Sequence, residues 1–159
     1  MKNYISKIRT KIGQDKFIHP GARILIENDK NEILFIERVD NEKLGIPAGA
    51  LEENETIEAC IRREVKEETN LDILTLEVIG ISSNPNLESV EYPNGDKIQY
   101  FTIEFYSNDW TGELRINDKN EVRNVVFKDK KHLMQLPENE QSIVKSLAYY
   151  QKNHKIQLK

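Results

Sequence analysis

Hydrophobic residues recur along the chain with two periods, and these periods predict its secondary structure. Near the start, Tyr4, Ile5, Ile8 and Ile12 have helical spacing and predict a short amphipathic helix over residues 2–12. Runs rich in β-branched and aromatic residues, bounded by turn-forming residues, predict strands at 22–27, 32–38, 74–81, 98–106 and 122–127, with a loop at 82–91. The remaining predicted helices are residues 56–69, 130–135 and 138–153. This order of elements predicts a mixed sheet covered by helices on both faces.

The predicted helix at residues 56–69 has carboxylates on its apolar side. Successive residues of a helix are about 100° apart, so apolar residues one turn apart form a stripe. That inward stripe consists of Ile57, Cys60, Ile61 and Val65. Glu64 and Glu68 fall inside the stripe, and Glu67 borders it. Carboxylates one turn apart repel each other, and burial removes their hydration, so these positions are costly without a partner.

A bound divalent cation would relieve this repulsion. Arg63 lies beside Glu67, but one cation cannot neutralise three carboxylates. A ligand set made only of carboxylates suits Mg²⁺ or Mn²⁺ better than zinc, which would recruit His or Cys. The chain's three histidines are scattered and are interpreted as surface or capping residues; they are His19, His132 and His154. A solvated acidic helix is the alternative, and for most Glu-rich segments it is the correct one.

Composition narrows the class of protein. The 159 residues fit one domain with one sizeable core. The net charge of −4 disfavours a bulk nucleic-acid binder, which usually has a basic excess. The single cysteine, Cys60, excludes an internal disulfide and is expected to be a small buried hydrophobe. The first 17 residues contain no continuous apolar stretch, so neither a signal peptide nor a membrane anchor is expected, and we expect a cytoplasmic protein.

Residues 49–71 resemble the signature of the Nudix hydrolase family, the MutT-like pyrophosphohydrolases. The signature reads G-x5-E-x7-R-E-U-x-E-E-x-G-U, where U is a bulky aliphatic residue. This chain matches eight of its nine defined positions, with Gly49, Glu55, Arg63, Glu64, Val65, Glu67, Glu68 and Leu71. Asn70 stands where the family has glycine. A helix ending at Thr69 needs a left-handed residue next, and asparagine is the second choice after glycine.

The resemblance implies a fold and an activity. The implied fold is an α/β/α sandwich whose signature segment, the Nudix box, forms a loop–helix–loop at the active site. Residues 1–159 would form a single domain, with 1–16 as an N-terminal helical extension. The implied activity is divalent-metal-dependent hydrolysis of a phosphoanhydride bond in a nucleoside diphosphate linked to another moiety. The substrate stays open among nucleoside triphosphates, ADP-ribose, nucleotide sugars and similar compounds, and both a monomer and a homodimer are compatible with this activity.

The resemblance also implies roles for individual residues. Glu64, Glu67 and Glu68 would hold the metal ions, and Gly49 would lend a backbone carbonyl. Arg63 and Glu55 would orient these carboxylates by ion pairing. Arg63, Glu64 and Glu67 are therefore expected to be catalytic.

A further carboxylate outside the box often assists in this family as a base or as an extra ligand. Glu121, ahead of the predicted strand 122–127, is the first candidate, with Glu91 and Glu113 behind it. A solvated loop residue is an equally good interpretation of Glu121. The alternative to an enzyme is a non-catalytic nucleotide-binding regulatory module on a Nudix fold. The intact Arg63-Glu64 and Glu67-Glu68 pairs favour the enzyme.

Overall fold

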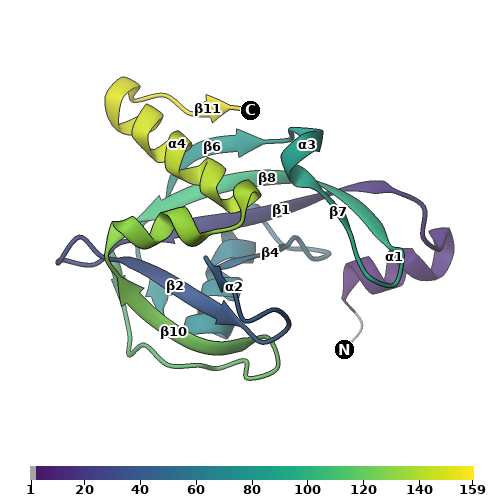
Figure 1. Cartoon of the computed structure of the whole chain (residues 1–159), viewed down its shortest axis with the longest axis horizontal. Helices are drawn as coiled ribbons and strands as arrows, with labels where there is room; N and C mark the ends of the chain where they lie inside the picture. The colour runs from purple at the N-terminus through teal and green to yellow at the C-terminus, as the bar shows by residue number, and fades with distance from the viewer. Residues whose placement is uncertain (1–2) are drawn as a thin grey trace.

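The computed structural model describes residues 3–159 (Figure 1). Its helices are α1 (Tyr4–Ile12), α2 (Ile57–Thr69), α3 (Pro85–Glu88), the 3-10 helix η1 (Lys130–Gln135) and α4 (Glu138–Asn153). The longer strands are β1 (Phe17–Ile26), β2 (Ile33–Arg38), β6 (Glu77–Ser82), β8 (Lys97–Ser107) and β10 (Val122–Lys128). The short strands are β3 (Leu44–Gly45), β4 (Ala48–Ala50), β5 (Asp72–Ile73), β7 (Ser89–Glu91), β9 (Trp110–Thr111) and β11 (Gln157–Leu158).

The central sheet is mixed, as the sequence predicts. Its strand order is β11-β6-β8-β1-β4, and β7 pairs with the first residues of β8. β1 and β8 run parallel from the Phe17–Ile98 pair to the Ile26–Ser107 pair. β4 is antiparallel to β1, and β6 is antiparallel to β8 but parallel to β11. A second sheet has the order β10-β2-β3, and β5 pairs with β9.

Two hydrophobic clusters cover the two faces of the strands. In β1, Ile24 and Ile26 pack with α2 on one face, while Leu25 packs with η1 and α4 on the other. In β2, Leu34 faces the α2 cluster and Phe35 faces the α4 cluster. Strands buried on both faces are apolar at consecutive positions, which explains the continuous hydrophobic runs. The helices α2 and α4 thus sandwich the strands (Figure 1).

Most predicted elements are confirmed, but three segments differ. The strand predicted at 22–27 corresponds to β1, which begins five residues earlier, at Phe17. The predicted strand 74–81 begins only at Glu77, because the Leu74 and Thr75 amides donate to the Asp109 carbonyl instead. The predicted loop 82–91 contains α3 and β7. The helix α3 starts at Pro85, whose fixed φ suits a first helical turn, and the Asn84 side chain accepts a hydrogen bond from the Asn86 amide.

One histidine prediction is wrong. His19 is a buried residue of β1, and its Nε2 lies 3.1 Å from the Leu51 carbonyl oxygen. Burial lowers the pKa of His19. The ring packs against Tyr4 of α1 and Phe17, so the N-terminal helix contributes to its burial. Cys60, in contrast, is fully buried as expected.

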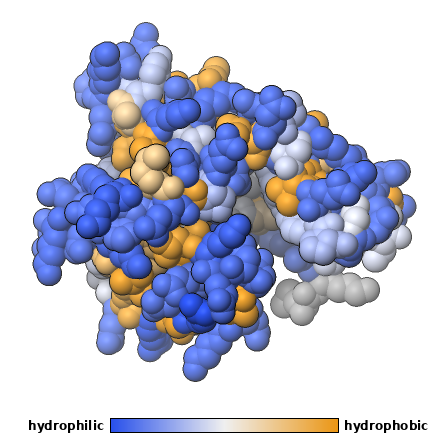
Figure 2. Space-filling view, in the orientation of Figure 1, coloured by the Kyte–Doolittle hydropathy of each residue, from blue (hydrophilic) through white to orange (hydrophobic). Residues whose placement is uncertain are grey.

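The surface is largely hydrophilic on the side shown in Figure 2, with scattered hydrophobic patches and a hollow beside the lobe that carries α1. Within residues 3–159, no helix has the length and apolar character needed to cross a membrane.

Candidate active site

The helix α2 presents the acidic residues, and local signals define its two ends. At the N-terminus, the Thr56 side chain accepts a hydrogen bond from the Ala59 amide. At the C-terminus, Asn70 adopts the left-handed conformation (φ 65°, ψ 7°), and its amide donates to the Lys66 carbonyl. The prediction that Asn70 serves in the place of glycine is therefore confirmed for the backbone.

The predicted inward stripe of α2 is confirmed. Cys60, Ile61 and Val65 are fully buried against the sheet. Glu68 is buried with 3% of its surface exposed, and the Glu64 side chain is 13% exposed. The Glu67 side chain is 52% exposed, in agreement with a position at the border. Two carboxylates therefore lie on the buried face of the helix, one turn apart.

The guanidinium of Arg63 gathers three glutamates. Its Nε and Nη2 donate to the two oxygens of Glu55 at 2.7 and 3.0 Å. Its Nη1 donates to Glu64 at 2.7 Å and to Glu67 at 3.3 Å. Nη2 also donates to the Ala50 carbonyl at 3.2 Å, which connects the arginine to the end of β4. A bidentate arginine–carboxylate pair fixes orientation as well as charge, so Glu55 holds Arg63 in place.

Gly49 of β4 lies against Glu64. A Cβ atom at this position would overlap the Glu64 carboxylate, so a side chain at position 49 would displace it. The glycine is needed here for close approach and not for an unusual backbone angle.

The comparisons with known proteins agree with this geometry. The NUDIX domain family profile matches residues 17–149. This chain belongs to the Nudix family. An ADP-ribose pyrophosphatase of Methanocaldococcus jannaschii is 32% identical over 152 residues, which cover 91% of this chain and 84% of the relative. An RNA pyrophosphohydrolase of Marinomonas sp. is 34% identical over 61 residues, or 38% of each chain.

Solved structures confirm the fold. A MutT protein from Methanosarcina mazei Go1 superposes with a TM-score of 0.66 at 19% identity, over 89% of this chain and 99% of that one. A MutT Nudix hydrolase from Burkholderia pseudomallei has a TM-score of 0.65 at 17% identity, over 82% and 98%. The family and these relatives make the chain a Nudix pyrophosphohydrolase, in the α/β fold expected from the Nudix box.

Electrostatics single out two carboxyl groups of the Nudix box. Burial raises the pKa of Glu64 to about 7, against the opposing effect of Arg63 and with support from Glu67 and Glu121. Burial also raises the pKa of Glu68 well above its usual value, reinforced by the charge of Glu64 and opposed by Arg38. The Oε2 atom of Glu68 is buried without a hydrogen-bond partner among the described residues. A buried acceptor left in this state is costly and indicates that a partner belongs there.

The carboxylate oxygens of Glu64 and Glu68 suit a hard divalent cation, because hard cations prefer oxygen ligands and the negative charge of this pair is not fully compensated. As the side chains stand, no three His, Cys, Asp or Glu residues within 3–159 converge on a common metal position. Arg63 is bonded to Glu64 and Glu67 in this arrangement. These contacts use only Oε1 of Glu64 and Oε2 of Glu67, so the other oxygen of each carboxylate is not bonded to Arg63.

Glu121 is the only one of the three additional carboxylates whose charge acts on both buried glutamates. It raises the pKa of Glu64 and of Glu68, although its own side chain is exposed. Its carbonyl accepts a hydrogen bond from the Val39 amide at 3.0 Å, which anchors the loop before β10 beside β2. Glu91 lies in β7. The backbone carbonyl of Glu113 accepts a hydrogen bond from the Asn70 side chain.

Sequence reasoning missed Arg38, the last residue of β2. Its Nη2 donates to Glu140 at 2.9 Å, and its charge lowers the pKa of Glu68. Burial lowers the pKa of Arg38 while Glu140, Glu68 and Asp40 raise it, and the net shift is upward. In the sequence, only its place at the end of a buried strand distinguishes Arg38. That place alone does not indicate a partner about 100 residues away.

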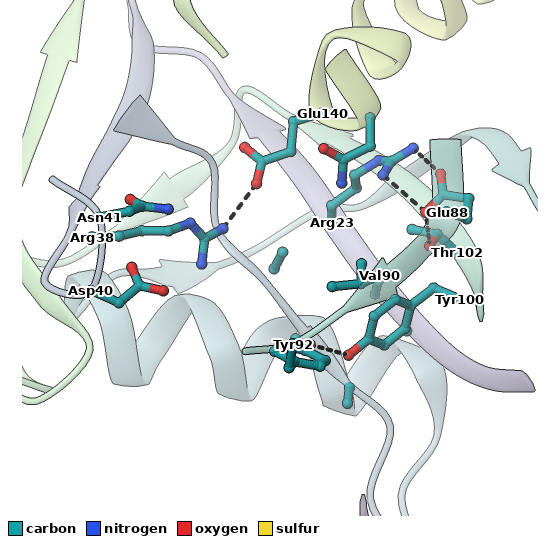
Figure 3. Close-up of a pocket in the computed structure, with 16 residues that line it drawn as sticks. Arg23, Arg38, Asp40, Asn41, Glu88, Val90, Tyr92, Tyr100, Thr102 and Glu140 are labelled. Carbon is teal, nitrogen blue, oxygen red and sulfur yellow. Dashed lines mark hydrogen bonds and ion pairs between the residues drawn. The ribbon is translucent and has the colours of Figure 1, made fainter. Parts of the chain in front are cut away.

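A cavity of about 370 Å³ adjoins the Nudix box (Figure 3). It lies among β1, β4, β7, β8, the turn after β2 and the start of α4. Gly49 and Arg38 line it, so it borders both Glu64 and the cation beside Glu68. The aromatic residues from Tyr100 to Trp110 have different surroundings. Tyr100 lines the cavity, whereas Phe105 is in the core and Trp110 stacks on Phe127.

Proposed function

We propose that this enzyme hydrolyses, with a divalent cation, a phosphoanhydride bond in a nucleoside diphosphate linked to another moiety. The observation that carries the proposal is that the buried Oε2 of Glu68, beside Glu64, has no hydrogen-bond partner within residues 3–159. Two carboxyl groups whose pKa values are raised by burial need a cation to be ionised together near neutral pH. The named activities of the two relatives, an ADP-ribose pyrophosphatase and an RNA pyrophosphohydrolase, support the same reaction class.

Glu64, Glu67 and Glu68 would hold Mg²⁺, with Mn²⁺ as a substitute, and the Gly49 carbonyl would be a further ligand. A divalent cation at such a site supplies positive charge to the phosphate oxygens and acidifies water. Arg63 would keep Glu64 oriented through its bidentate bond to Glu55. The reaction needs mainly positioning and charge stabilisation, which this constellation provides.

Glu121 would accept a proton from the attacking water. Its side chain is exposed and therefore reaches solvent, and its charge already influences Glu64 and Glu68.

The test is turnover of a nucleotide panel by the purified protein with Mg²⁺, with Mn²⁺ and with excess EDTA, with products identified. The panel contains nucleoside triphosphates, ADP-ribose, nucleotide sugars and 5′-triphosphate RNA. We expect cleavage at a phosphoanhydride bond that EDTA abolishes and added Mg²⁺ restores. Robust turnover in EDTA would contradict the metal role. Saturable nucleotide binding without turnover of any compound would instead identify a regulatory module.

A further inference from the structure

The cavity beside the Nudix box has two chemically different ends. Figure 3 shows Tyr92 and Tyr100 on one side and Arg38, Asp40 and Asn41 on the other. Gly49 also lines the cavity, and its backbone lies against the Glu64 carboxylate. A volume of about 370 Å³ is in the range of small-molecule sites. A molecule that places its reacting group near Gly49 can thus extend toward an aromatic end and a polar end.

The aromatic end offers a planar surface. The Tyr92 and Tyr100 hydroxyl oxygens are 3.1 Å apart, so each phenol orients the other. Tyr92 is 40% exposed, which leaves part of the ring accessible to a ligand. Stacking on an accessible aromatic ring is how proteins bind the flat face of a nucleobase without selecting a particular base.

The cavity contains two arginines, but one of them is largely engaged. Arg23 donates from Nε to Glu104 at 3.0 Å and from Nη2 to Glu88 at 2.8 Å. Its Nη1 also reaches Glu88, and Nη2 donates to Ser142 at 2.9 Å. Lys159 also pairs with Glu104 at 2.7 Å, so two cations face the two buried carboxylates and the charges of this cluster balance. Four of its five N–H groups are thus engaged, and its charge is matched within the cluster, so Arg23 mainly shapes the wall.

Arg38 is the remaining cation of the cavity wall, and acidic residues flank it. It bonds to Glu140 through Nη2, and the charge of Asp40 also acts on it. Counting the ionisable residues of the wall gives Arg23 and Arg38 against Asp40, Glu88 and Glu140, a net charge of −1. Arg38 suits one diphosphate, but among residues 3–159 no further cation lines the polar end for an additional phosphate.

We propose that this cavity selects a nucleoside diphosphate sugar, with the base on Tyr92 and the sugar hydroxyls donating to Asp40. The inference rests on the proposed hydrolysis and names its substrate class. A carboxylate accepts hydrogen bonds from hydroxyl groups, and the half-buried Asn139 adds an amide to the same wall. A third phosphate in this place would put its negative charge beside Asp40 and Glu140, which is unfavourable.

Two matched substrate pairs test the assignment, ADP-ribose against ATP and UDP-glucose against UTP, all with saturating Mg²⁺. Within each pair only the group beyond the second phosphorus differs. We expect the sugar-linked compound of at least one pair to have a kcat/KM about 100-fold higher than its triphosphate. A preference below about tenfold in both pairs, or a preference for triphosphates, would overturn the assignment. No turnover of any nucleotide in the larger panel would instead overturn the proposed hydrolysis itself.

Substitutions at the two ends separate their roles. Asp40→Asn should lower kcat/KM for the preferred sugar substrate about tenfold and raise triphosphate cleavage, because it removes one of the charges that repel a third phosphate. Asp40→Lys should raise triphosphate cleavage further. Asp29→Asn, in the exposed turn after β1, is the matched control and should change neither. Tyr92→Ala should raise KM for both members of a pair about tenfold, whereas Tyr92→Phe should not. Equal losses on both substrates in Asp40→Asn would exclude the hydroxyl-binding role.

Discussion

The backbone of Gly49 lies so close to the Glu64 carboxylate that a Cβ atom at position 49 would occupy the same space. Gly49 is in β4 and Glu64 is in α2, so this contact connects the strand at the start of the Nudix box to its helix. It explains in steric terms why the box begins with glycine. The position of a proposed metal ligand depends here on the absence of a side chain.

Gly49→Ala should therefore damage activity more than stability. The Glu64 side chain can rotate away from the added methyl group, so we expect a cost of only about 1–2 kcal/mol in unfolding free energy. The displaced carboxylate would no longer be in position, and kcat should fall by about 100-fold or more. Thermal melts and steady-state kinetics on the same preparation decide this. A variant with full activity would show that the exact position of Glu64 is not needed.

Glu68→Gln should stabilise the metal-free protein, and the effect should grow with pH. The raised pKa of Glu68 means that the folded state binds the proton of the Glu68 carboxyl group more tightly than the unfolded state does. In EDTA the parent should lose stability relative to the variant as pH rises above about 4.5, the usual value for a glutamate. Near pH 8 the difference should reach about 1 kcal/mol or more.

Saturating Mg²⁺ should reverse the order. The parent gains stability because the cation binds only the folded state, whereas Glu68→Gln gains much less and turns over slowly. Melting curves at pH 5 and pH 8, each with EDTA and with Mg²⁺, provide the complete comparison. If Glu68→Gln melts far below the parent in EDTA at pH 8, the carboxylate is part of a structural ion pair and the metal argument is wrong.

Asn70 is held by more than its backbone conformation. Its Nδ2 donates to the Glu113 carbonyl at 2.8 Å, and its Oδ1 accepts from Asn117 at 3.2 Å. Helix capping alone would make Asn70→Gly neutral or slightly stabilising, but loss of these two hydrogen bonds should make it destabilising by about 1 kcal/mol.

Asn70→Val should cost more than Asn70→Gly, since it loses the same bonds and a β-branched residue resists a positive φ. Chemical denaturation of both variants measures the order. Equal free energies of unfolding for the Gly and Val variants would remove the conformational part of the argument.

Glu121→Gln should lower kcat by about 100-fold with little loss of stability, because its exposed side chain supports catalysis and not packing. Glu91→Gln and Glu113→Gln are matched controls, since both replace exposed glutamates outside the Nudix box. Normal kcat in Glu121→Gln together with a loss in either control would transfer the base role to that residue.

The sequence by itself determined the acidic helix, its two ends and which of its faces is buried. The stripe of α2, its Thr56 and Asn70 ends and the inward placement of Glu64 and Glu68 follow from residues within a few turns of one another. Such features depend on helical periodicity and on capping, which are local. The bonds from Arg63 to Glu55 and Glu64 are local in the same sense, since they join residues within one box.

Only the tertiary structure decided how the cavity is built. Arg38 meets Glu140 across 102 positions of sequence, and Arg23 meets Glu104 across 81. Tyr92 faces Tyr100 because β7 folds back on β8, in a segment that the hydrophobic pattern predicts as a loop. His19 is buried because α1 and β1 pack together, although nothing around it in the sequence is continuously apolar. Side chains that meet through strand pairing and helix packing have no periodic signature, so the residues that select a substrate become visible only once the chain is folded.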